Sequence, residues 1–93
     1  HFPTWIEKER SDERKARLRL KFMLSQAALH KYGVTSIRKV ADDAGCDHSS
    51  IFNAIQRGWF TEPMARAIER VFGRATLPAE WLVRPLEAGQ VNA

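Results

Sequence analysis

The stretch "ADDAGCDHSSIFNAIQRG", residues 41–58, decides the fold of this chain. Two short apolar patterns meet in it at Gly45, and the second pattern ends at Gly58. Glycine commonly ends a helix because it adopts the left-handed conformation without a Cβ penalty. The stretch therefore predicts a helix that stops at Gly45, a three-residue turn, and a second helix over residues 48–57.

The inward faces of both helices follow the helical period. In the first helix, which we expect Ser36 to cap, four apolar residues recur at i, i+3, i+4 and i+7: Ile37, Val40, Ala41 and Ala44. In the second helix, which we expect Asp47 to cap, three apolar residues point inward: Ile51, Ala54 and Ile55. Two short helices that cross at a tight turn form a helix-turn-helix, which we predict over residues 36–58.

The second helix opens with a polar cluster, His48, Ser49 and Ser50. Its outward face carries hydrogen-bonding side chains and one ring, where an exposed helix ordinarily has Lys and Glu: Ser49, Phe52, Asn53 and Gln56. Amides and hydroxyls read base edges in the major groove of DNA, and an apolar group contacts the thymine methyl. The alternative is an exposed helix of small polar residues without a partner. We favour the base-edge interpretation.

These same residues resemble the helix-turn-helix of phage Cro repressors. The shared features are a polar residue followed by serine at 48–49, together with Ala41, Asp43, Gly45, Ile51, Ala54, Ile55 and Gly58. The resemblance covers about residues 36–58. Farther along, "EPMARAIERVFG" and "LPAEWLVRPL" resemble the helical end of Cro-like prophage regulators. The resemblance implies binding to double-stranded DNA by an all-helical domain.

The resemblance also implies roles for single residues. It places His48, Ser49 and Asn53 at base edges, and Phe52, where the family has a short polar residue, against a thymine methyl. For His48 the alternative is an exposed residue at a helix start. It places four groups at phosphates: the side chains of Arg38, Lys39 and Arg57, and the backbone N–H of Ser36. Ser50 and Gln56 lie on the same polar face and complete the candidate DNA-binding set.

Outside this unit the sequence predicts three more helices and no sheet. A long helix begins after Ser11 and ends at Gly33, a fourth follows Thr61, and a short fifth begins at Pro78. We therefore expect an all-α, compact five-helix repressor-like domain over residues 11–85. Residues 1–10 are expected to form an arm, in which Pro3 disfavours a helix while Trp5 and Ile6 dock on the domain. Residues 86–93 are expected to form a flexible tail.

The long helix has two apolar stripes where a surface helix ordinarily has one. The first consists of Leu18, Phe22, Leu29 and Tyr32, and the second of Leu20, Met23, Leu24 and Ala27. The extra stripe needs a cover: the arm, the C-terminal segment or another subunit. We expect an intramolecular cover for part of it and a dimer contact for the rest. After the helix at residues 48–57, we expect Trp59 and Phe60 to pack the loop onto the core.

Composition narrows the classes of function. Residues 1–39 hold ten Lys and Arg against four Asp and Glu, which fits either a polyanion partner or a solvated basic face. The single cysteine, Cys46, excludes an internal disulfide and is expected in the core. No apolar run approaches the length of a bilayer span, so we expect a cytoplasmic protein that contacts no membrane. No nucleophile–base pair, paired carboxylates or metal set stands out, so we expect neither an enzyme nor a cofactor.

We therefore predict a sequence-specific DNA-binding transcriptional regulator of phage or prophage origin. As a homodimer it would place two recognition helices about 34 Å apart on a palindromic operator. The alternative is a helix-turn-helix that serves protein interaction or assembly, as in a phage packaging component or an antitoxin.

Overall fold

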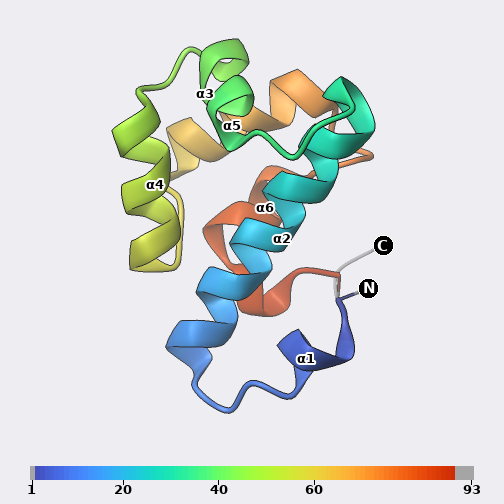
Figure 1. The fold of residues 1–93 in the computed structure, drawn as a ribbon. Helices are drawn as coiled ribbons and strands as arrows, with labels where there is room; N and C mark the ends of the chain where they lie inside the picture. The colour runs from blue at the N-terminus through green and yellow to red at the C-terminus, as the bar shows by residue number, and fades with distance from the viewer. Residues whose placement is uncertain (1, 90–93) are drawn as a thin grey trace.

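The long helix α2 (Asp12–Tyr32) is the axis around which the other elements are arranged, as Figure 1 shows. The structure is a computed structural model that describes residues 2–89. In this span the chain is all-α and has no strand. It forms six α-helices, one more than expected, and a 3₁₀ turn. The other elements are α1 (Thr4–Glu7), α3 (Ile37–Ala44), α4 (His48–Arg57), α5 (Glu62–Phe72), α6 (Ala79–Val83) and η1 (Pro85–Glu87).

One core joins these elements. Helix α5 packs between α3 and α6, while α2 contacts α3, α4 and η1. The largest fully buried side chains of this core come from each of the longer helices, from α6 and from the loop before α5: Leu20, Leu24, Val40, Ile51, Phe60, Ile68 and Leu82. Cys46 packs against this core and is half-buried. Burial of these apolar surfaces supplies the main driving force for the fold.

The ends of the central helices lie where local sequence signals predict them. The Ser11 Oγ accepts a hydrogen bond from the Arg14 N–H and the Ser36 Oγ accepts one from the Lys39 N–H, each at 3.2 Å. Gly45 ends α3 with φ of 73°, in the left-handed region. Asp47 and Thr61 occupy the predicted cap positions of α4 and α5 but make no side-chain cap hydrogen bond.

The two apolar stripes of α2 differ in burial. The stripe of Leu20, Met23, Leu24 and Ala27 is buried in the core. The other stripe is partly covered from within the chain, because the Phe2 ring packs on Phe22 and the Phe72 ring packs on Tyr32. Leu29 is 43% exposed. The intramolecular cover is thus confirmed for part of the stripe, and a dimer contact at Leu29 stays a prediction.

The N-terminal arm differs from the expectation in two ways. Pro3 does not prevent a helix there but caps the single turn of α1, since proline lacks only an N–H that a helix start leaves unpaired. Ile6 is fully buried, as expected, whereas Trp5 is 61% exposed instead of docked. One turn of helix can turn only one of two adjacent side chains inward, and Ile6 takes that place.

The C-terminal segment also packs farther than expected. Residues 85–87 form η1 against α2, and Ala88 is buried, so a flexible tail does not begin at residue 86. The cause is Arg19 of α2, which is 7% exposed and donates hydrogen bonds to the carbonyl oxygens of Pro85 and Leu86 at 3.1 and 3.0 Å. The rest of the predicted tail, residues 90–93, lies outside the described residues.

Among residues 2–89, no helix has both the length and the apolar composition needed to cross a bilayer.

Candidate nucleic-acid interface

Helix α4 presents a polar face to solvent because its apolar residues take one side. Ile51, Ala54 and Ile55 are buried, so Ser49, Asn53 and Gln56 lie on the opposite side and are exposed. Ser50 and Arg57 flank this face on one side, and Phe52, 44% exposed, flanks it on the other. Residues 48–57 contain no carboxylate. The outward direction of the predicted polar face is confirmed.

His48 is engaged on both ring nitrogens at the start of α4. Its Nδ1 lies 3.2 Å from the Arg38 Nε, and its Nε2 lies 2.7 Å from an Asp42 carboxylate oxygen. Both partners come from α3, so this cluster spans the turn between the helices. A base contact by either ring nitrogen would compete with these hydrogen bonds. The predicted base contact of His48 therefore competes with hydrogen bonds inside the molecule, which the sequence did not reveal.

Arg57 and Trp59 form a stacked pair at the other end of α4. The Arg57 Nε donates to the Trp59 carbonyl oxygen at 3.1 Å, and its guanidinium carbon lies 4.1 Å from the centre of the Trp59 ring. Trp59 is 46% exposed, so its expected packing on the core is wrong, whereas Phe60 is fully buried as expected. The Phe60 N–H donates to the Leu82 carbonyl oxygen, which fixes the loop with Phe60 inward.

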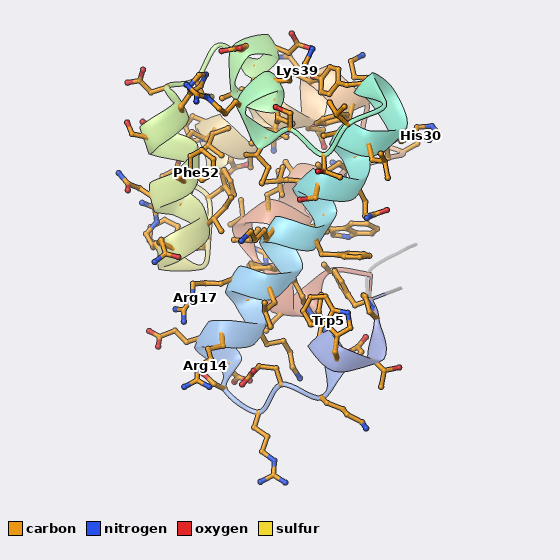
Figure 2. The ribbon with its side chains drawn as sticks, viewed as in Figure 1. Trp5, Arg14, Arg17, His30, Lys39 and Phe52 are labelled. Atoms are coloured by element: carbon orange, nitrogen blue, oxygen red, sulfur yellow. The ribbon has the colours of Figure 1, made fainter. Side chains whose placement is uncertain are left out.

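The first turn of α3 contributes the remaining predicted residues. Arg38 and Lys39 are exposed there, and the Lys39 ammonium lies 5.8 Å from the centre of the Tyr32 ring. Ser36 is half-buried, because its hydroxyl caps α3. Figure 2 shows Lys39 on α3, at the end of the molecule where α3 and α4 meet.

Two basic residues outside the predicted set lie along the same side of the molecule. Figure 2 shows Arg14 and Arg17 on the first half of α2, on the side that α4 and Phe52 occupy. Gly58, at the end of α4, abuts α2, since a Cβ on it would lie 3.6 Å from the Ala16 Cβ. The only sequence signal for these residues is the basic run over residues 13–21, which is equally typical of a solvated helix.

Two carboxylates at the α3–α4 corner are bound by side chains other than Lys and Arg. Asp42 is bound by His48, and Asp43 accepts a hydrogen bond from the Tyr32 hydroxyl at 2.6 Å. Burial, the hydrogen bond to Asp43 and the nearby negative charge raise the pKa of Tyr32 to about 12. Among the described residues, neither Arg38 nor Lys39 is in an ion pair. The corner therefore keeps its cations available for an external anion.

A concave region lies away from α4, between α2 and the terminal segments. It is a groove of about 620 Å³ with mostly apolar walls, which include Phe22, Met23, Leu77 and Trp81. Arg19 lies at this groove and is paired with Glu7 at 3.1 Å. Within residues 2–89, no group of His, Cys, Asp and Glu is arranged to hold a metal ion.

Comparison of the chain with protein-family models, with curated proteins and with solved structures finds no match. The relation of residues 36–58 to phage Cro repressors therefore stays a prediction.

Proposed function

We propose that this protein is a sequence-specific DNA-binding transcriptional regulator that inserts α4 into the major groove. The observation that carries the proposal is the exposed face of α4, which combines a hydroxyl and two amides with no carboxylate. Asn and Gln pair with adenine through two hydrogen bonds, and Ser bonds to either kind of base-edge group. A helix that merely faced water would gain nothing from this choice of residues.

The exposed polar face of α4, which we call the reading face, consists of Ser49, Asn53 and Gln56. The hydrogen bonds within the molecule leave this face free. In the described part of the chain, the α4 side chains that form hydrogen bonds are His48 and Arg57, which lie at its two ends. Ser49, Asn53 and Gln56 thus keep their donors and acceptors for a partner. Ser50 and Phe52 border this face, and an exposed ring there is suited to a thymine methyl.

Cations lie where a helix in the major groove would meet the DNA backbone. Arg38 contacts His48 at the N-terminal end of α4, Lys39 follows Arg38 in the first turn of α3, and Arg57 lies at the C-terminal end of α4. The backbone N–H of Ser36, at the start of α3, adds a possible phosphate donor. Phosphate contacts of this kind set the orientation of the protein on the duplex, and base contacts then supply specificity.

We further propose that a homodimer binds a palindromic operator, with its two α4 helices about 34 Å apart. The stripe of α2 that is only partly covered, with Leu29 exposed on it, favours association of some kind, because a surface helix ordinarily has one apolar stripe. The same observation favours the second candidate function, a protein-interaction or assembly module. Analytical ultracentrifugation separates the two, since a regulator forms a closed dimer and an assembly component forms a larger ring.

The experiment that tests the proposal is selection from a randomised duplex pool, followed by affinity measurements on the enriched duplex at several salt concentrations. Enrichment of a short palindrome supports the regulator, and the spacing of its half-sites gives the geometry of the dimer. Weak binding that is uniform across sequences and collapses with salt contradicts it, because charge alone then explains the contact. The matched control is the Ser49→Ala/Asn53→Ala/Gln56→Ala variant, which keeps every cation.

A further inference from the structure

We infer that Asp42 is a positioning residue that orients the Arg38 guanidinium, through His48, toward a DNA phosphate. Asp42 is acidic and lies outside the set of residues predicted to bind DNA. The inference depends on the proposed function, because it gives a role in that interface to a carboxylate that would by itself repel DNA.

The direction of the hydrogen bonds in this cluster follows from their chemistry. The Arg38 Nε carries a hydrogen and can only donate, so the His48 Nδ1 at 3.2 Å must accept. A neutral imidazole has one N–H, which must then be on Nε2, and Nε2 lies 2.7 Å from the Asp42 carboxylate. Asp42 thereby fixes the tautomer of His48, and this tautomer is the one that can hold Arg38.

The placement of His48 also keeps Arg38 away from Asp42. These two residues are four apart on α3, a spacing at which opposite charges ordinarily pair directly. Within the described residues they form no direct ion pair, because the imidazole from α4 lies between them. His48 therefore occupies the carboxylate that would otherwise attract and neutralise the guanidinium.

The Arg38 side chain is left with a defined set of free donors. Its Nε is used by His48, so the hydrogens on the two terminal nitrogens remain, in a planar fork. Such a fork matches two oxygens of one phosphate group. Both ends of the hydrogen-bond chain are on α3 and its middle is on α4, so the fork has a fixed direction relative to the reading face.

The hydrogen bonds that link Asp42, His48 and Arg38 require a neutral imidazole. A second proton on His48 would turn Nδ1 into a donor that faces the Arg38 cation, while Asp42 would still accept from Nε2. The charged groups that face the ring are Arg38 and Asp42, both from α3, and Asp47 precedes it in sequence. The hydrogen bonds from Arg38 to His48 and from His48 to Asp42 are therefore both possible only when the ring carries a single proton, on Nε2.

The decisive test compares two carboxylates at the same corner by affinity for the selected duplex. Asp47 also adjoins α4, but its side chain makes no cap hydrogen bond, so Asp47→Ala is the matched control. Removing either negative charge favours DNA binding electrostatically. Despite this electrostatic gain, we expect Asp42→Ala to weaken binding about 3–10-fold, because one orienting hydrogen bond is lost. Asp47→Ala should not weaken binding. Asp42→Asn, whose amide oxygen also accepts, should restore most of the affinity.

The role of Arg38 is checked by a double-mutant cycle. In an Arg38→Ala background, Asp42→Ala should cause no further weakening, because the group it orients is gone. The inference is overturned if Asp42→Ala strengthens binding as much as Asp47→Ala does, or if it weakens binding equally in the Arg38→Ala background.

A measurement on the free protein distinguishes failure of this inference from failure of the proposed function. Nitrogen-15 NMR of the histidine rings, with His48 assigned by its loss in a His48→Gln variant, should show the Nε2-protonated tautomer and a hydrogen-bonded Nδ1. The opposite tautomer would contradict the inferred hydrogen bonds between Asp42, His48 and Arg38, whether or not the protein binds DNA. The tautomer could be as expected while the pool yields no specific duplex. The hydrogen bonds between Asp42, His48 and Arg38 would then be confirmed as a link between α3 and α4, and the phosphate contact of Arg38 would be refuted together with the proposed function.

Discussion

The carboxylates at the two ends of the molecule are bound by different kinds of side chain. Near the termini, Glu7 pairs with a cation, Arg19, which is buried and also lies 4.6 Å from the centre of the Phe2 ring. At the α3–α4 corner, Asp42 and Asp43 are bound instead by the His48 ring and the Tyr32 hydroxyl, and by neither Lys nor Arg among the described residues.

The difference separates cations that are held within the molecule from cations that are not. A buried guanidinium must find its partners within the chain, because an unpaired charge is very costly out of water. Arg19 therefore binds the first and last described segments to α2 and serves the fold. Arg38 and Lys39 are exposed and lack carboxylate partners among the described residues, so their charge is available to a phosphate. Four predictions test this contrast.

The largest effect is expected at the terminal end. Arg19→Met keeps the apolar part of the side chain but leaves two carbonyl oxygens, of Pro85 and Leu86, without their donor. We expect the free energy of unfolding to fall by about 3 kcal/mol, at the low end for breaking a buried pair because the Glu7 side chain is 49% exposed. Urea denaturation followed by circular dichroism measures this.

The control for Arg19 is an arginine in an exposed pair. Arg66 lies 2.8 Å from Glu62 one turn earlier on α5, and both side chains are more than half exposed. Arg66→Met should cost no more than about 0.5 kcal/mol. Equal losses in the two variants would show that Arg19 does not bind the terminal segments to α2.

The next effect concerns binding and not stability. Asn53→Ala should cost about 1–3 kcal/mol on the selected duplex and relax discrimination at one base position, because it would remove the base-edge contact proposed for Asn53. Arg57→Ala should weaken binding to all sequences to a similar degree, since it would remove the phosphate contact proposed for Arg57. Competition assays with single-base variants of the duplex measure both. Unchanged binding by Asn53→Ala would remove Asn53 from the reading face.

A third, smaller effect tests the turn that holds the corner together. Gly45 has φ of 73°, and a Cβ on it would meet nothing within 4 Å, so Gly45→Ala adds backbone strain without a clash. We expect a loss of about 1 kcal/mol in the free energy of unfolding. Gly45→Asn should lose less, because asparagine tolerates the left-handed region better. A larger loss for Asn than for Ala would contradict strain as the cause.

Most of the fold could be predicted because its helix boundaries depend on residues within one turn of them. Ser11 and Ser36 cap their helices locally, and Gly45 and Gly58 end theirs. The outward face of α4 could be predicted for the same reason, since residues at helical spacing share a side whatever they pack against.

The features that could not be predicted depend on contacts between separate segments. Arg19 belongs to a basic run that is typical of a solvated helix, and its partners lie 66 and 67 positions away. The hydrogen bonds of His48 depend on how α3 crosses α4, which no residue type reveals. Trp59 and Phe60 are both large aromatics, and only the path of the loop determines that Phe60 is buried and Trp59 is not.

The smallest effect is a titration at the corner. Tyr32 is the only tyrosine of the chain, so the absorbance of tyrosinate reports it alone. Its pKa is raised to about 12, first by burial and then by its hydrogen bond to Asp43 and the charge of that carboxylate. The midpoint in the folded protein should lie near this value, well above the ordinary 10 of an unfolded chain.

The sign of the linked effect on stability follows from these two values. Because the folded state holds the phenol proton more tightly, the stabilisation from Tyr32 is complete below about pH 10 and is lost as the pH rises toward 12. Tyr32→Phe should remove this alkaline loss. Asp43→Asn should lower the midpoint only part of the way to 10, because burial remains. A midpoint near 10 in the unchanged protein, with circular dichroism showing it folded, would mean that the phenol does not hold Asp43, and that this carboxylate is free to neutralise the nearby cations.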